Sequence, residues 1–213
     1  MTQIADFVAE LTSIDVCDDA IALWRVADLE RHVDRDALLA GDDPPEPPYW
    51  AHLWTGALVL AGAVPANAGS VLELGCGLGL PGLVAARRGA RVTFVDRLAA
   101  PLAFVRASAA ANRVGPVHLC VADFADEALR GSFDLILAAE VLYDRATLGT
   151  LPLALRRRLR PGGRALLTDA LRTDTTAFYA GLDASGLSWR VSEHAVREEG
   201  LPLTVRLVEV LGR

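Results

Sequence analysis

Lysine is absent from this 213-residue chain, because all 21 of its basic residues are arginine. Acidic residues number 27, so the formal net charge is −6 and the pI lies near 5.2. A protein that holds a nucleic-acid backbone needs a clustered basic face. The sequence therefore predicts no nucleic-acid partner and favours a basic peptide or another cationic ligand. It also leaves the chain without a lysine side chain of its own to be modified.

Cysteine and histidine are scarce, and neither forms a ligand pattern. The three cysteines, Cys17, Cys76 and Cys120, contain no C-x-x-C pair, and the four histidines lack the spacing of a metal site. An odd number of unpaired cysteines argues against a disulfide scaffold. The histidine spacing argues against zinc. The sequence therefore predicts no metal.

Long hydrophobic runs are missing as well, although 52% of the residues are hydrophobic. No uninterrupted apolar stretch reaches the roughly 18 residues that a membrane span requires. The first residues, Met1 to Phe7, lack the basic start and apolar core of a signal peptide. We therefore expect a soluble, cytoplasmic protein that does not associate with membranes.

The first 46 residues are expected to form an extension to a single domain that spans residues 47–213. Ile4, Phe7, Val8 and Leu11 fall on one helical face, which predicts an amphipathic helix at the start. Residues 14–40 fit helix in part and strand in part, with residues 21–26 as the candidate strand. Four prolines between residues 41 and 48 exclude regular structure there and predict a linker or the edge of a lid.

A glycine-rich turn follows the apolar run of residues 71–74 and leads into the helical spacing of residues 80–84. Glycine allows a sharp turn and lets a ligand touch the main chain, while N–H groups at the helix start suit a carboxylate. Glu73 adds a partner for an ammonium group. A ligand with both groups describes the methionine part of S-adenosylmethionine better than a pyrophosphate. The predicted cofactor-binding residues of this turn are Glu73, Gly75, Cys76, Gly77 and Gly79.

The next two apolar strands also end in residues that suit a nucleoside. Residues 92–95 lead to Asp96, whose carboxylate can accept both hydroxyl groups of a ribose. Residues 117–121 lead to Asp123 and Phe124, which can bond an adenine amino group and cover its ring face. Carboxyl ends of parallel strands share one edge of the sheet, so we expect these side chains to lie around one ligand.

A fourth strand, residues 133–139, ends in Glu140-Val-Leu-Tyr143. We hypothesise that Glu140 orients a cationic amine while Tyr143 packs against its stem by a cation–π contact. The alternative is that Glu140 caps the helix that follows. Methyl transfer needs alignment rather than a protein nucleophile, because proximity alone supplies roughly 7–11 kcal/mol. The series of four strand ends is the pattern of class I methyltransferases.

The same glycines permit a rival interpretation. Gly77, Gly79 and Gly82 fit the G-x-G-x-x-G dinucleotide pattern, and Asp96 suits the ribose of either nucleotide. A dehydrogenase, however, would continue with a βαβ unit and a substrate domain. Here residues 188–194 and 203–211 alternate apolar and polar residues across a turn, which predicts a C-terminal antiparallel hairpin.

The predicted fold is an α/β, Rossmann-like, doubly wound sheet in three α/β/α layers, mostly parallel and closed by that hairpin. Helical spacing predicts a helix with both indoles of Trp50 and Trp54 on its buried stripe. The other predicted elements are helices over residues 101–112, 147–160 and about 173–186 and a fifth strand over residues 164–168.

These motifs resemble the family-16 lysine-methyltransferase-like group of seven-strand methyltransferases, from Pro47 to about Val210. The resemblance rests on the Trp-bearing segment of residues 48–56, on the E-L-G-C-G-L-G turn, and on the acid-x-x-aromatic motif of Glu140 and Tyr143. It implies that Trp54, the glycines, Asp96, Phe124 and Ala139 line the cofactor and that Glu140 and Tyr143 face the methyl acceptor. The N-P-P-Y motif of amide and base N-methyltransferases is missing, which weighs against those acceptors.

The resemblance implies an S-adenosylmethionine-dependent N-methyltransferase that acts on a protein lysine. A small-molecule amine is the alternative acceptor. Two other functions stay open: a non-catalytic S-adenosylmethionine-binding scaffold and an NAD-dependent oxidoreductase. The sequence does not predict the oligomeric state.

Overall fold

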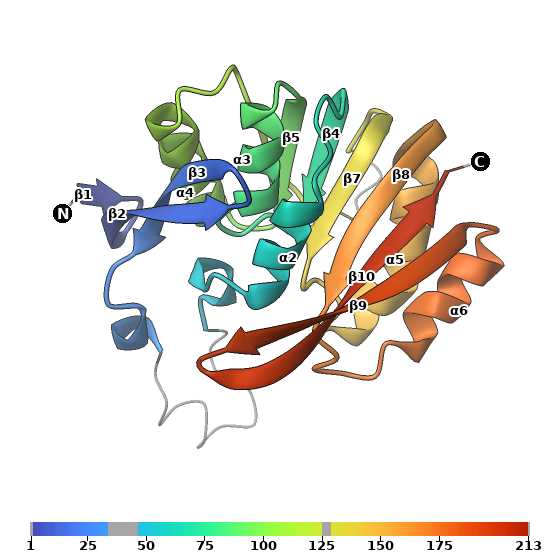
Figure 1. Cartoon of the computed structure of the whole chain (residues 1–213). Coiled ribbons are helices and arrows are strands. Elements are labelled where there is room, and N and C mark those ends of the chain that lie inside the picture. Colours follow the sequence, from blue (N-terminus) through green and yellow to red (C-terminus); the bar gives the residue numbers. More distant parts are fainter. Residues whose placement is uncertain (1, 34–46, 125–128, 213) are drawn as a thin grey trace.

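The fold was established from a computed structural model, which describes residues 2–33, 47–124 and 129–212. Its centre is a seven-stranded sheet in the order β6-β5-β4-β7-β8-β10-β9 (Figure 1). The strands are β4 (Ser70–Leu74), β5 (Arg91–Asp96), β6 (His118–Val121), β7 (Phe133–Ala139), β8 (Leu159–Asp169), β9 (Ser188–Glu198) and β10 (Leu201–Leu211). β10 pairs antiparallel with both of its neighbours, β8 and β9, and the other neighbouring strands of this sheet pair in parallel.

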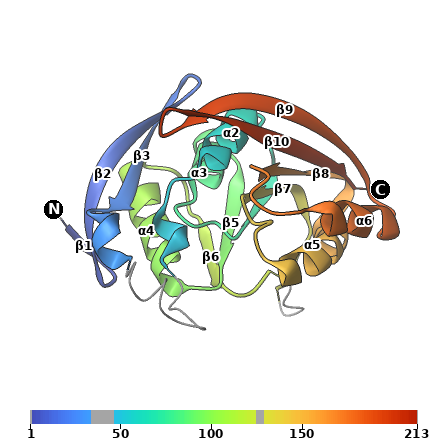
Figure 2. The same ribbon diagram turned by 90° about the horizontal axis from the view of Figure 1, so that it is seen from below.

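Helices cover both faces of the sheet, as Figure 2 shows for α2 and α3 on one side and α5 on the other. Right-handed crossovers require this arrangement, because the chain moves outward from β4 to β6 and then returns through β7 and β8. In the central strand, Val71 faces one core while Leu72 and Leu74 face the second. The helices are α2 (Thr55–Ala63), α3 (Leu80–Arg87), α4 (Ala99–Ala111), α5 (Arg145–Arg158) and α6 (Thr176–Ala184).

The sheet order confirms the predicted fold class. An all-parallel dinucleotide-binding sheet has no antiparallel strand inserted next to its edge, whereas β10 lies between β8 and β9 here. The predicted hairpin is present and longer than expected. Glu199 and Gly200 form its turn at φ 49° and 82°, the positive angles of a tight two-residue hairpin.

The N-terminal helix prediction is wrong. The segment forms a three-stranded antiparallel sheet of β1 (Thr2–Ile4), β2 (Phe7–Val16) and β3 (Asp19–Val26), followed by the short 3-10 helix η1 (Leu29–His32). This sheet lies beside α3 and α4 (Figure 1). The side chains of Ser108 and Asn112 bond the backbone of β3 at Trp24 and Ala22. The free edge of β3 is thereby paired with α4.

The predicted helix over the two indoles also needs correction. The chain forms the 3-10 helix η2 (Tyr49–Ala51), and α2 begins only at Thr55, with Trp54 as its N-cap residue. Trp50 instead packs its ring 5.3 Å from the rings of Phe7 and Phe104. The strand alternative for residues 21–26 is confirmed within β3. The predicted linker lies mostly outside the described residues.

Within the described ranges, no helix is both long and apolar enough to cross a membrane. The same residues contain no cluster of three or more histidine, cysteine, aspartate or glutamate side chains able to hold a metal ion.

Candidate active site

A cavity of about 780 Å³ opens at the carboxyl ends of the parallel strands. Its volume lies within the usual range for small-molecule sites, roughly 300–1,000 Å³. The structure brings every site residue named from the sequence to its lining. They are Trp54, Glu73, Gly75, Cys76, Gly77, Gly79, Asp96, Asp123, Phe124, Ala139, Glu140 and Tyr143.

The glycine turn joins β4 to α3 and forms the floor of one half of the cavity. Gly75, Gly77 and Gly79 have φ angles of 57°, 49° and 73°, a region that other residues enter at a cost. A Cβ atom on Gly77 would lie 2.9 Å from the carbonyl oxygen of Trp50. The turn therefore requires glycine twice over, for its backbone angles and for the segment that crosses it.

Glu73 lies in β4 beneath this turn and is 1% exposed. Its Oε2 accepts a hydrogen bond of 2.9 Å from the backbone N–H of Gly82. Burial, with a smaller contribution from nearby Asp96, raises the pKa of Glu73 to about 8, although the hydrogen bond from Gly82 opposes the rise. A Cβ on Gly82 would lie 2.3 Å from Glu73 Oε2. Gly82 therefore serves close packing of helix and strand, which explains why the chain matches the dinucleotide pattern.

Asp96, at the end of β5, is also buried. Its two carboxylate oxygens accept hydrogen bonds from the backbone N–H groups of Gly77 at 3.0 Å and Leu98 at 3.1 Å. Burial raises the pKa of Asp96, and these two donors oppose that rise. Asp123 and Phe124 follow β6 on the same wall, with Asp123 exposed and Phe124 half-buried.

Glu140 occupies the opposite half of the cavity, directly after β7. Its backbone has φ 53°, a left-handed conformation that costs roughly 1–2 kcal/mol for an ordinary residue. The carboxyl group packs against α2, where a Cβ on Gly56 would lie 2.2 Å from its Oε1. The backbone N–H of Ala170 donates to its Oε2 at 3.3 Å. Oε1 is buried and has no hydrogen-bond partner among the described residues.

The alternative role for Glu140, as cap of the next helix, is wrong. Asp144 is the N-cap of α5, and its Oδ1 accepts a hydrogen bond from the backbone N–H of Ala146 at 3.2 Å. Burial raises the pKa of Glu140; Arg172 opposes the rise, while Asp169 and Glu198 add to it. Glu140 thus combines a left-handed backbone with a buried oxygen that has no hydrogen-bond partner among the described residues, two features that often occur together at functional sites.

Two charged residues that the sequence reasoning missed lie beside Glu140. Arg172 Nε is 3.7 Å from Glu140 Oε2, and its guanidinium carbon is 4.8 Å from the ring centroid of Trp54. Arg172 Nη2 donates to both oxygens of Glu198 at 2.7 and 2.8 Å, at the end of β9. The position of Arg172, three residues after the last residue of β8, is the signal that could have identified it.

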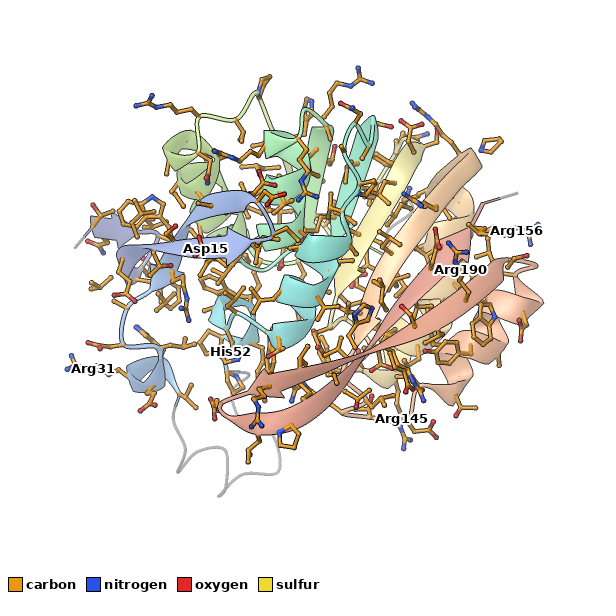
Figure 3. The ribbon with its side chains drawn as sticks, viewed as in Figure 1. Asp15, Arg31, His52, Arg145, Arg156 and Arg190 are labelled. Atoms are coloured by element: carbon orange, nitrogen blue, oxygen red, sulfur yellow. The ribbon has the colours of Figure 1, made fainter. Side chains whose placement is uncertain are left out.

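Trp54 and His52 complete this side. Their rings lie 4.4 Å apart, and the Trp54 indole N–H donates to the carbonyl oxygen of Tyr49 at 3.1 Å. Burial lowers the pKa of His52. His52, which is labelled in Figure 3, lies between η2 and the start of α2, and the charges of Glu198 and Glu199 in the β9–β10 hairpin act on it. Trp54 thus contacts Arg172 on the Glu140 side, and its predicted role toward the cofactor stays a prediction.

The lining residues fit S-adenosylmethionine. Two buried acids with raised pKa, Glu73 and Asp96, face a cavity in which an ammonium group and ribose hydroxyl groups would stabilise their charged forms. The glycine turn brings the main chain to the surface of the cavity beside the start of α3, which suits a carboxylate. Burial raises the pKa of Cys76 well above its usual value, which disfavours the thiolate, the nucleophilic form of cysteine.

Comparison with known proteins agrees with this geometry. The family described as "Methyltransferase domain" matches residues 71–163. Protein N-lysine methyltransferase METTL21A of Mus musculus is 39% identical over 107 residues, which are 44% of this chain and 48% of that protein. A ubiquinone biosynthesis O-methyltransferase of Pseudomonas aeruginosa is 30% identical over 115 residues, 54% of this chain and 50% of that protein.

Solved structures extend the likeness of fold over nearly the whole chain. The T. thermophilus 16S rRNA N2 G1207 methyltransferase RsmC, in complex with AdoMet and guanosine, has a TM-score of 0.69 and 19% sequence identity. The match covers 96% of this chain and 51% of that one. This chain spans about half the length of the curated relatives it matches. Residues 71–163 are therefore similar to the methyltransferase domain family, and the sheet that contains them has the Rossmann-like methyltransferase fold.

Proposed function

We propose that the protein transfers a methyl group from S-adenosylmethionine to the side-chain amine of a protein lysine. The observation that carries this proposal is Glu140, whose Oε1 is buried without a hydrogen-bond partner among the described residues. An ammonium group is the donor that such an oxygen lacks. The match to an N-lysine methyltransferase and the net charge of −6 also support a basic protein substrate.

The two halves of the cavity have separate tasks in this proposal. S-adenosylmethionine, when bound, supplies an electrophilic methyl group on its sulfur. Gly75 to Gly79 hold the amino-acid tail, Asp96 accepts the ribose hydroxyl groups, and Asp123 with Phe124 hold the adenine. Glu140 captures the acceptor amine as its ammonium form and aims it, and Tyr143 packs on its stem. Proton loss to water, as the amine is desolvated, leaves the neutral nucleophile.

The test is transfer of a labelled methyl group from S-adenosylmethionine to the proteins of a cell lysate, with modified residues identified by mass spectrometry. Methylated lysine is the expected product, and it must come from a substrate because this chain has no lysine. Label found only in small molecules, as an amine or an oxygen ether, would replace the lysine proposal. Binding of S-adenosylhomocysteine without any transfer would indicate a scaffold.

The matched variant is Glu140→Ala. We expect turnover to be abolished while the affinity for S-adenosylhomocysteine, measured by thermal shift, stays unchanged. Loss of cofactor affinity instead would place Glu140 in the other half of the site.

A further inference from the structure

We propose that Arg172 is a positioning residue of the acceptor half: it occupies the competing carboxylate Glu198, so that Glu140 alone receives the acceptor amine. This inference rests on the proposed amine acceptor. Arg172 lies in the loop after β8, and Glu198 lies at the tip of the β9–β10 hairpin.

The first support is the geometry of the charged groups. Arg172 Nη2 bonds both oxygens of Glu198, and Thr55 Oγ1 donates to Glu198 Oε1 at 3.0 Å. Glu198 is thus fully engaged between the hairpin tip, the start of α2 and the loop after β8. Glu140, in contrast, retains one buried oxygen without a partner among the described residues.

The second support is that the guanidinium of Arg172 contacts Trp54, Glu140 and Glu198. Its guanidinium lies over the ring of Trp54, 4.8 Å from the centroid, in a cation–π arrangement. Leu171, the residue before it, has φ 57°, a left-handed angle that turns the chain after β8. The Nε of Arg172 lies 3.7 Å from Glu140 Oε2. A fixed cation between two acids decides which of them keeps a free oxygen.

The charges that act on Glu140 come from three neighbouring residues. Arg172 opposes the rise in the pKa of Glu140, whereas Asp169 and Glu198 increase it. Removal of Arg172 should therefore lower turnover for two reasons. It frees Glu198 to compete for the amine, and it raises the pKa of Glu140, so that the carboxylate exists only at higher pH.

The test measures kcat, KM and the pH profile for wild type, for Arg172→Gln and for the double variant with Glu198→Gln. The substrate is the lysine-containing protein identified by the labelling experiment. For Arg172→Gln we expect kcat to fall about 10- to 100-fold, because small misplacement is costly, without an increase in KM. The acid limb of the profile should move to higher pH. The double variant should recover part of the lost kcat and return the limb toward that of wild type.

A purely structural ion pair predicts another result. The double variant would then be no better than Arg172→Gln, and the acid limb would not move; either finding overturns the inference. The matched control is the exposed pair Arg206 and Glu193, with Nε and Oε1 3.2 Å apart on the same hairpin and outside the cavity. Arg206→Gln and its double variant with Glu193→Gln should behave as wild type.

A binding probe separates this inference from the proposed function. With protein saturated by S-adenosylhomocysteine, titration calorimetry with n-butylamine should show binding to wild type, loss in Glu140→Gln, and binding at least as tight in Arg172→Gln. No binding to wild type would overturn the amine acceptor itself. Binding to wild type with a weakened Arg172→Gln would leave the acceptor intact and overturn the role given to Arg172.

Discussion

The two halves of the cavity are built in different ways. In the cofactor half, Glu73, the glycine turn, Asp96 and Asp123 come from three successive strand ends between residues 73 and 123. In the acceptor half, Glu140 and Arg172 line the cavity, while Gly56 and Glu198 lie behind them. These four residues come from four segments spread over more than half of the chain. One half is local in sequence, and the other is assembled only by the fold.

The acids of the two halves also differ in their partners. Glu73 and Asp96 accept hydrogen bonds from backbone N–H groups. Glu140 also accepts one such bond, from Ala170 to its Oε2, but it lies beside an arginine and its Oε1 has no partner among the described residues. Backbone donors fix the position of a carboxylate whatever the neighbouring side chains are. A side-chain partner can be exchanged, which suits the half that determines the acceptor.

The largest effect is expected from Gly77→Ala, which disturbs only the cofactor half of the cavity. The new Cβ adds strain of about 1–2 kcal/mol at a positive φ and lies 2.9 Å from the Trp50 carbonyl oxygen. We expect about 100-fold weaker binding of S-adenosylhomocysteine by calorimetry, with n-butylamine still bound. The control is Gly89→Ala, which has φ 88° but nothing within 4 Å of its Cβ. An equal loss of affinity for S-adenosylhomocysteine in both variants would show that backbone strain alone, and not the contact with Trp50, causes the loss.

Gly56→Ala disturbs the acceptor half of the cavity. Its Cβ would lie 2.2 Å from Glu140 Oε1, so the carboxyl group must move. Turnover should fall about 10- to 100-fold while the affinity for S-adenosylhomocysteine is spared. Gly62→Ala on the same helix meets only Cys17 Sγ at 3.7 Å and should stabilise the fold by up to about 1 kcal/mol. Full activity in Gly56→Ala would contradict the position given to Glu140.

Glu73→Gln changes the pH dependence of stability in the ligand-free protein. Because burial raises the folded pKa to about 8, from 4.5 in the unfolded chain, the folded state holds the extra proton between these values. Stability is full below the lower value and is lost as pH rises toward the upper one, by at most about 1.4 kcal/mol per pH unit. The melting temperature should therefore fall about 2–4 °C for each kcal/mol.

The melting temperature of Glu73→Gln should depend less steeply on pH between 5 and 8. An unchanged slope would show that Glu73 is not protonated in the free protein. S-adenosylhomocysteine should also flatten the slope in wild type, because its ammonium group stabilises the carboxylate.

Asp134→Asn should have the smallest effect and should affect neither half. Asp134 accepts hydrogen bonds from the backbone N–H and Oγ of Ser70, and these donors with Arg160 lower its pKa to about 2. This stability is present above pH 4 and is lost as pH falls through about 2, so the variant should melt slightly lower near pH 7 and follow wild type near pH 2. A change in the affinity for S-adenosylhomocysteine or for n-butylamine would show that both halves of the cavity depend on the amino-terminal edge of the sheet, where Asp134 lies.

The contrast between the halves explains what the sequence could predict. The glycine turn, Asp96 and Glu140 follow apolar strands, and a parallel sheet brings strand ends together whatever the loops do. Arg172 follows β8 by the same rule and could have been found. Glu198 could not, because its contact with Arg172 and Thr55 depends on how far the β9–β10 hairpin reaches across the sheet edge.

The N-terminal sheet shows a second limit. Val8 and Leu11 completed the helical pattern, yet they are 50% and 49% exposed. The two buried residues of β2 are instead Ala9 and Val16, one of them too small to stand out in a hydrophobic pattern. Exposed apolar residues on a strand can therefore mimic helical spacing when the buried residues are small.

We propose that one cavity binds the cofactor at residues 73–79 and the acceptor at Glu140, and a crystal structure with S-adenosylhomocysteine would show both sites at once. We expect the amino-acid tail on the glycine turn, the ribose on Asp96 and the sulfur facing Glu140. A ligand bound elsewhere, or with its sulfur turned away from Glu140, would contradict this proposal.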